Sequence, residues 1–109
     1  MFARVVEFTP KMEKKDELIK MVRQEVLPIL RKQPGFLELM PFDPEMAEEK
    51  AIAITLWSEK RHAERYVKDV LPKVEQMLKP FIVTKFAARN YNVETTLCQH
   101  LVDALTAVA

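Results

Sequence analysis

The single tryptophan, Trp57, ends a stretch in which small side chains recur at every second position. Ala51, Ala53 and Thr55 precede it, so in a β-strand all four side chains share one face. Small residues beside an indole leave room for a flat apolar ring. The spacing predicts a cavity that binds a small aromatic molecule through Trp57, Ala53 and Thr55. The same pattern is also typical of a core in which helices pack closely and the tryptophan acts as a plug.

Glu7 is the carboxylate that we expect nearest to this cavity. It lies in the first apolar segment at the same strand parity as Ala3 and Val5, and we place Ala3 in the small wall of the cavity. Burial raises the pKa of a carboxyl group, which makes the group a usable general base. Glu7 is therefore a candidate catalytic residue. The alternative is a solvated glutamate near a strand end, paired with an arginine.

His62 and Tyr66 are four positions apart, so on a helix they lie on the same side. We predict that they orient a substrate hydroxyl or move a proton. The alternative is a core tyrosine and a surface histidine near the helix start. Arg89, with Asn90 and Tyr91, is a further candidate polar anchor for the substrate, although the sequence does not say which of the three faces inward.

Composition argues against several other classes of site. Gly35 is the only glycine, whereas phosphate-binding loops of nucleotide-binding proteins need several. His62, Cys98 and His100 lack the spacing of a metal site, so no metal is expected. The 17 Lys and Arg against 16 Asp and Glu form no basic stripe, so we expect no nucleic-acid partner. One cysteine and a start too polar for a signal peptide or membrane span predict a cytoplasmic location and no membrane partner.

Strands and helices must position these residues. Alternation and composition predict strands over 2–9, 36–42, 50–57 and 81–94. Apolar side chains at helical spacing predict one helix between Lys14 and the Gln33-Pro34-Gly35 stop, and a second from Ser58 to about Leu78.

The element order predicts one ferredoxin-like α+β domain, βαββαβ, over residues 1–94, with a four-stranded antiparallel sheet. A short amphipathic helix follows in residues 95–109, with Leu97, Leu101, Ala104, Leu105 and Val108 on its apolar stripe. A helix this short is unstable alone in water. We therefore expect the extension to dock on the domain or on a dimer partner.

An internal repeat supports two βαβ halves. Val26-Leu27-Pro28 recurs as Val70-Leu71-Pro72, 44 positions later, although so short a match also arises by chance. Each proline removes a backbone donor and clashes with the preceding turn. Both helices are therefore predicted to kink or break.

The third strand is apolar on both faces, while two helices cover only one face of a sheet. Ile52, Ile54 and Leu56 point away from the side of Trp57. Residues expected to extend this second face are Val6, Phe8, Phe36, Met40 and Phe42. Because soluble monomers rarely expose so large an apolar patch, we predict a homodimer through the sheet faces. The alternative is a monomer in which the C-terminal helix covers this face.

The motif order resembles the antibiotic biosynthesis monooxygenase-like (ABM) domains of the dimeric α/β-barrel superfamily. The shared features are a long helix ending in Pro34-Gly35-Phe36, a strand ending in Trp57-Ser58, and a following helix; the resemblance covers roughly residues 2–94. It implies homodimers built by packing two sheets, and a pocket between sheet and helices that Trp57 faces. It also implies oxidation of phenol- or quinol-type substrates by oxygen, with no cofactor.

The leading hypothesis is thus a cofactor-independent monooxygenase in which Trp57 stacks on a small aromatic substrate. Glu7 would remove a phenolic proton and make the substrate electron-rich. One alternative is a non-catalytic dimer that binds a small ligand or a partner. Another is a polyketide-cyclase-like or isomerase activity that uses His62 and Tyr66.

The haem-degrading branch of the superfamily matches less well. Glu7 stands where that branch is taken to carry an Asn, and no histidine occurs among Val74, Glu75 and Gln76 of the second helix. Monooxygenase members also tend to carry an Asn four residues before the Trp, where this chain has Ala53.

Overall fold

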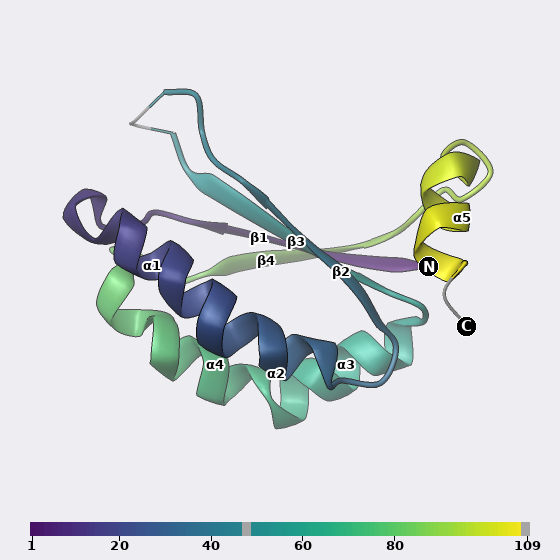
Figure 1. Ribbon diagram of the computed structural model, residues 1–109, viewed down its shortest axis with the longest axis horizontal. Coiled ribbons are helices and arrows are strands. Elements are labelled where there is room, and N and C mark those ends of the chain that lie inside the picture. Colours follow the sequence, from purple (N-terminus) through teal and green to yellow (C-terminus); the bar gives the residue numbers. More distant parts are fainter. Residues whose placement is uncertain (47–48, 108–109) are drawn as a thin grey trace.

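A four-stranded antiparallel sheet forms one layer of the molecule, and helices cover one of its faces (Figure 1). The structure is a computed structural model that describes residues 1–46 and 49–107. The spatial strand order is β2-β3-β1-β4, and the predicted ferredoxin-like α+β fold is confirmed. The strands are β1 (Phe2–Phe8), β2 (Phe36–Phe42), β3 (Ala51–Trp57) and β4 (Ala87–Asn92).

Two helical segments lie against the sheet, and each is interrupted. The first runs through a 3-10 turn (Met12–Lys14), α1 (Lys15–Met21), a π-helical turn (Val22–Val26) and α2 (Leu27–Arg31). The second comprises α3 (Lys60–Asp69), α4 (Leu71–Leu78) and a 3-10 turn (Lys79–Phe81).

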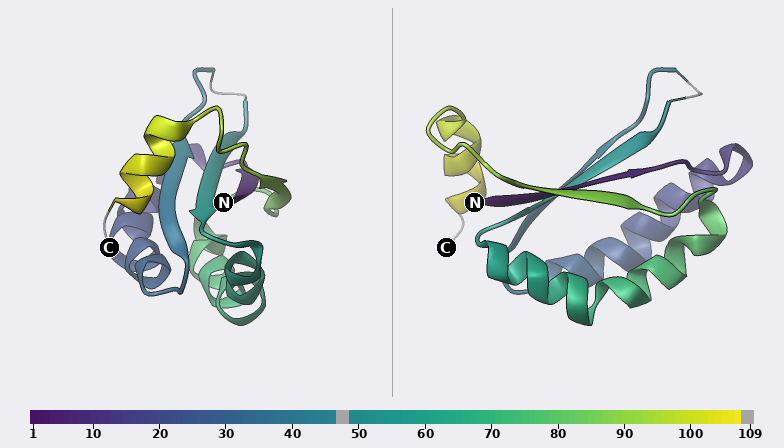
Figure 2. Two further views of the ribbon diagram at one scale, coloured as in Figure 1. Left: turned by 90° about the vertical axis from the view of Figure 1, so that its right-hand side faces the viewer. Right: turned by 180° about the vertical axis from the view of Figure 1, so that it is seen from behind.

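The two prolines of the internal repeat explain the interruptions. Pro28 has no N–H to donate to the preceding turn, and the π-helical turn Val22–Val26 lies directly before α2. Pro72 stands at the start of α4, where Val70 leaves helical geometry with φ −120° and ψ −40°. The predicted kinks are therefore confirmed. They let both segments follow the twisted sheet (Figure 2).

The fourth strand is shorter than the predicted 81–94. Pro80 lies in the 3-10 turn Lys79–Phe81, and Ile82 makes only an isolated bridge to Pro10. The Val83 N–H donates to the Thr9 carbonyl at 2.7 Å, but regular pairing with β1 begins at Ala87. The apolar stretch before Ala87 thus belongs to a connection, which brings Phe86 beside Phe8 at a ring distance of 5.4 Å.

The second face of the sheet carries no part of α1 to α4 (Figure 1). The register places Ile52, Ile54 and Leu56 there, opposite Glu7, Val5 and Ala3 respectively. Met40 and Phe42 pair with Ile54 and Ile52 and extend this face as predicted. The expectation was wrong for Val6, Phe8 and Phe36, which lie on the helix-covered face. Val6 pairs with Ala53, Phe8 pairs with Ala51, and Phe36 pairs with Trp57.

The C-terminal helix α5 (Gln99–Thr106) lies at the N-terminal end of β1, on the side opposite to the other helices (Figures 1 and 2). Leu97 is 85% exposed and Leu101 38% exposed, so Leu97 is uncovered and Leu101 is partly covered. Val108 lies outside the described residues, and docking of the extension stays a prediction. None of the helices within residues 1–46 and 49–107 has the length and apolar character needed to cross a membrane.

Candidate functional site

A cavity of about 130 Å³ lies between the helix-covered face of the sheet and the two helical segments. Such a volume is close to the roughly 150 Å³ of an apolar cavity that holds one benzene ring. Its walls are almost entirely aliphatic and aromatic. The apolar lining residues are Val6, Phe8, Leu18, Val22, Val26, Leu30, Leu39, Pro41, Ala53, Leu71, Val74, Leu78 and Phe86.

Both proline-containing motifs shape this cavity. Val22 and Val26 begin and end the π-helical turn before Pro28, and both line the cavity. Beyond the break at Val70, Leu71 and Val74 line it from α4. Ala53 and Thr55, which the sequence placed in a cavity wall, also line this cavity.

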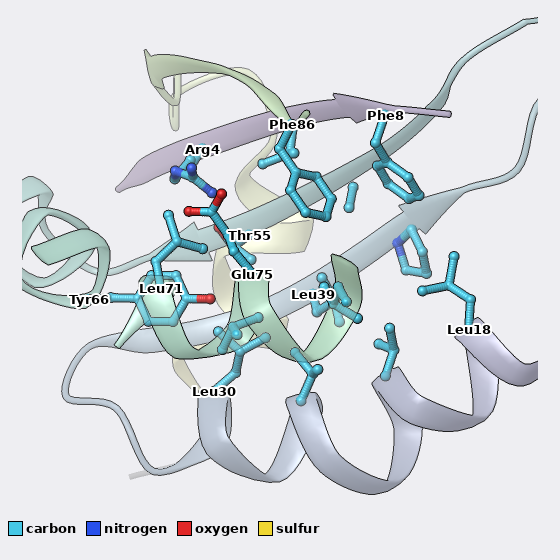
Figure 3. A pocket seen from close by; sticks show the side chains of 17 residues that line it. Arg4, Phe8, Leu18, Leu30, Leu39, Thr55, Tyr66, Leu71, Glu75 and Phe86 are labelled. Carbon is cyan, nitrogen blue, oxygen red and sulfur yellow. The ribbon is translucent and has the colours of Figure 1, made fainter. Parts of the chain in front are cut away.

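Four polar residues complete the described lining: Arg4, Thr55, Tyr66 and Glu75. They come from four elements, since Arg4 and Thr55 are cross-strand partners on β1 and β3, Tyr66 lies on α3, and Glu75 lies on α4. Figure 3 shows these side chains gathered at one end of the cavity, with Phe8 and Leu18 at the other. An apolar site with a few convergent polar groups is the usual form of a small-molecule pocket.

Arg4 is the unexpected member of this group. The residue is only 9% exposed, and its side chain forms no hydrogen bond or ion pair with any other residue of the described ranges. Burial lowers the pKa of the Arg4 guanidinium, although the nearby Tyr66 and Glu75 act in the opposite direction. An arginine nevertheless stays protonated in proteins, so a positive charge faces the cavity.

Tyr66 presents its hydroxyl to the cavity (Figure 3). The residue is 4% exposed, and burial raises its pKa to about 12, with Glu75 adding to the rise and Arg4 opposing it. Near neutral pH the hydroxyl is therefore protonated and available to donate a hydrogen bond.

Glu75 lies one turn beyond Leu71 on α4 and is exposed as a residue. Its carboxylate and the Arg4 guanidinium point toward one another (Figure 3). The charge of Glu75 raises the pKa of Arg4 and of Tyr66, whereas the charge of Arg4 lowers the pKa of Tyr66. No ion pair joins them among the described contacts. A solvated carboxylate and a buried guanidinium thus face the same space.

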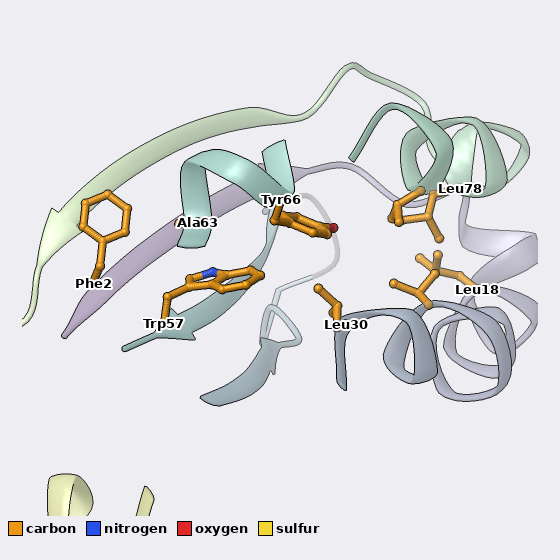
Figure 4. Packing of buried hydrophobic residues seen from close by; sticks show 9 residues of the cluster. Phe2, Leu18, Leu30, Trp57, Ala63, Tyr66 and Leu78 are labelled. Atoms are coloured by element: carbon orange, nitrogen blue, oxygen red, sulfur yellow. The ribbon is translucent and has the colours of Figure 1, made fainter. Parts of the chain in front are cut away.

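Trp57 lies on the helix-covered face but does not line the cavity. It is 0% exposed, and its indole N–H donates to Thr55 Oγ1 at 3.0 Å. Phe36 meets the indole edge to face at 5.5 Å, and Tyr66 packs against it at 5.1 Å. Figure 4 shows the indole packed in the core cluster beside Tyr66. Trp57 is therefore part of the packed core. Its neighbours Thr55 and Tyr66 line the cavity, but the indole does not.

The expected position of Glu7 was wrong. Glu7 pairs with Ile52 on the open face, so it and Ala3 point away from the cavity. Parity fixes which residues of one strand share a face, but the phase between two strands depends on their register. The sequence pattern that indicates a different residue is Phe2-Ala3-Arg4-Val5-Val6. In a strand, Arg4 lies on the same face as the apolar residues Phe2 and Val6.

His62 and Arg89 also lie away from the cavity. His62 packs over Gly35, where an added Cβ would overlap its imidazole, and its Nε2 lies 3.5 Å from Glu59 Oε2. Of the predicted pair, only Tyr66 reaches the cavity. Arg89 is exposed and pairs with Val5, which places it on the open face.

Within residues 1–46 and 49–107, no group of three or more His, Cys, Asp or Glu side chains has an arrangement that would hold a metal ion. The lining of the cavity offers two hydroxyl groups, one cation and one carboxylate around a space for a single ring. These groups can accept a proton from a bound hydroxyl and hold the resulting anion.

Comparison with known proteins identifies a matching family. The sequence profile described as "Antibiotic biosynthesis monooxygenase" matches residues 1–70. A search among curated proteins found no significant match.

Solved structures share the fold at low sequence identity. SnoaB, a cofactor-independent oxygenase from Streptomyces nogalater, is 16% identical with a TM-score of 0.68, over 88% of this chain and 95% of that chain. The haem degrader MhuD from Mycobacterium tuberculosis is 16% identical with a TM-score of 0.70, over 86% and 96%. A protein of unknown function from Nitrosomonas europaea is 7% identical with a TM-score of 0.68, over 85% and 88%. Identities this low support the fold alone.

Proposed function

The chain belongs to the antibiotic biosynthesis monooxygenase family, and we propose that it oxidises a single-ring phenol or quinol with O2 in the cavity beside Tyr66. The observation that carries this proposal is the combination of a ring-sized apolar space with three groups suited to phenol chemistry, namely Arg4, Tyr66 and Glu75. SnoaB shares the fold and is a cofactor-independent oxygenase.

The proposed reaction begins with proton removal. Glu75 takes the phenolic proton, and the phenolate oxygen is held by the positive charge of Arg4 and a hydrogen bond from the Tyr66 hydroxyl. The electron-rich phenolate gives one electron to O2, and the phenoxyl radical and superoxide then combine to form a C–O bond. Glu75 returns its proton to the peroxide. The O–O bond and the C–H bond at the same ring carbon then break, and the departing hydroxide and the ring proton leave as water. Phenol and O2 thus yield a quinone and water, without a further reductant.

Oxygen uptake by the purified protein with a series of single-ring phenols and quinols tests this proposal. A metal chelator should leave the rate unchanged. Glu75→Gln should reduce the rate by about 10²-fold or more, the usual contribution of a general base. Glu7→Gln is the matched control, because Glu7 lies on the opposite face. The proposal fails if Glu75→Gln retains the wild-type rate, or if every phenol that binds is inert.

Haem degradation is less compatible with this cavity. MhuD was solved with two haems in its active site, and one haem contains four pyrrole rings, whereas the present cavity of about 130 Å³ suits a single ring. An acid–base pair of His62 and Tyr66 is also disfavoured, since His62 packs over Gly35 instead of lining the cavity.

Non-catalytic binding is the second candidate. The apolar walls suffice to bind a small ring without any reaction. Binding of a phenol without oxygen uptake, by wild type and Glu75→Gln alike, would favour this function.

We also propose that the protein acts as a homodimer in the cytoplasm, with the open sheet faces packed together. Ile52, Ile54 and Met40 lie on this face together with Phe42, which is 51% exposed. Burying these side chains against a second copy removes apolar surface from water.

A further inference from the structure

We infer that Arg4 binds an anionic oxygen carried by the ring of the ligand, so that the cavity selects aromatic phenolates and carboxylates over neutral rings of the same size. This inference rests on the proposed function for the identity of the cavity as the binding site. It adds selectivity for charged over neutral rings in the bound state, and it extends the class of ligands to aromatic carboxylates.

The first step of the argument is the burial of Arg4. A guanidinium removed from water is costly unless an anion or hydrogen-bond acceptors replace the lost solvent. The Arg4 residue is 9% exposed, and its guanidinium lacks a protein partner among the described residues and keeps only slight contact with solvent. The residue lines the cavity. A ligand oxygen with negative charge would supply the acceptor that the protein itself does not.

The second step is the different environment of Glu75. This carboxylate lines the same cavity, but it belongs to an exposed residue of α4, so water can solvate it without a protein partner. The largely desolvated cation therefore gains more from a ligand of opposite charge than the solvated carboxylate does. Repulsion by Glu75 should nevertheless weaken the binding of an anion.

The third step is shape. The cavity holds about one ring. Arg4 lies beside Thr55 at one end of the cavity, and Phe8 and Leu18 lie at the other end (Figure 3). The charged oxygen should therefore sit directly on the ring or on a carboxyl group attached to it. A planar guanidinium can donate two parallel hydrogen bonds to a carboxylate, which favours this chemistry further.

Titration of para-nitrophenol tests the inference, because its phenolate absorbs visible light and its neutral form does not. The wild-type protein should shift the bound probe toward phenolate, raising the ratio of phenolate to phenol by about tenfold or more relative to water. Arg4→Met should abolish this shift. It should also weaken phenolate and benzoate binding by about tenfold to a hundredfold, since a hydrogen-bonded charge is lost.

Two further variants sharpen the test. Arg89→Met removes an arginine from the open face and should leave both readouts unchanged. Glu75→Gln should strengthen the binding of benzoate by removing repulsion, the opposite direction to Arg4→Met. Thermal unfolding of each variant checks the fold, and the result for Glu75→Gln keeps the inference testable if Arg4→Met does not fold.

The inference is overturned if Arg4→Met binds the phenolate as well as wild type does. It is also overturned if wild type prefers the neutral probe, if it binds neither form nor benzoate, or if Glu75→Gln weakens benzoate binding. These binding results are independent of oxygen uptake. Selective anion binding without turnover would support the role of Arg4 and refute the oxygenase proposal. Turnover without anion selectivity would support the oxygenase proposal and refute the role of Arg4 in selecting anions.

Discussion

Arg4 of β1 pairs with Thr55 of β3, and this register turns both side chains toward the helices. The same pairing turns the next residues, Val5 and Ile54, to the open face. One register thus separates a cavity with a buried cation from an apolar surface suited to a second subunit. A shift by one residue would exchange the two sets of side chains.

Tyr66 should make the stability of the protein fall at alkaline pH. Its pKa is about 12 in the folded state and about 10 in an unfolded chain. The contribution of the neutral buried hydroxyl is therefore fully present below about pH 10 and is lost as the pH rises to about 12. The loss should be about 2–3 kcal/mol of unfolding free energy.

Urea unfolding of wild type and Tyr66→Phe at a series of alkaline pH values measures this difference. The variant should lose less stability over the interval, because its side chain has no proton to release. Identical pH dependence in the two proteins would show that Tyr66 is not buried in its neutral form.

Gly35→Ala should lower the free energy of unfolding by roughly 2–3 kcal/mol. Gly35 has φ +77°, and a Cβ at this position would overlap the imidazole of His62. The substitution therefore adds a steric clash to an unfavourable backbone conformation. Chemical denaturation measures the loss.

The double variant Gly35→Ala, His62→Ala separates these two causes. Removing the imidazole should restore only part of the stability, because the Cβ of His62 also lies 2.7 Å from the added methyl group. Strict additivity of the two single substitutions would contradict a direct contact between Gly35 and His62.

Trp57→Phe should affect stability more than ligand affinity. The indole is fully buried and donates a hydrogen bond to Thr55 Oγ1, so its replacement should cost on the order of 1–3 kcal/mol. Its effect on para-nitrophenolate binding, by calorimetry, should be smaller than that of Arg4→Met. A larger loss of affinity than for Arg4→Met would support direct stacking of the ligand on Trp57.

Ile54→Glu should convert the proposed dimer into a monomer. Ile54 pairs with Val5 and Met40 on the open face, and a carboxylate there would be buried without a partner in the apolar interface. Light scattering after size-exclusion chromatography gives the mass. A monomeric wild-type protein would refute the dimer, as would a dimeric Ile54→Glu variant.

Sequence patterns predicted the fold better than they predicted the site. Pro28 and Pro72 act within a few residues, so the kinks that they cause could be predicted from local chemistry. The alternation of β1 and β3 correctly assigned the two faces of each strand. Which face of β1 adjoins Trp57 depends on hydrogen bonds between strands, and for this reason Glu7 was predicted in the place that Arg4 occupies.

Small side chains beside Trp57 predicted a cavity wall, and Ala53 and Thr55 do line the cavity. The position of the indole itself could not be predicted from this pattern, because it depends on Phe36 and Tyr66, which approach from other elements. Glu75 is one polar residue among several on α4, and nothing in its spacing distinguishes it.

Mass spectrometry of the product formed under isotopically labelled O2 tests the central claim most directly. Incubation of wild type with a single-ring phenol should give a quinone that contains one labelled oxygen atom, and Glu75→Gln should give none above the uncatalysed background. Label in the product at equal levels for both proteins, or a product that takes its new oxygen from water, would contradict the proposed oxygenase reaction.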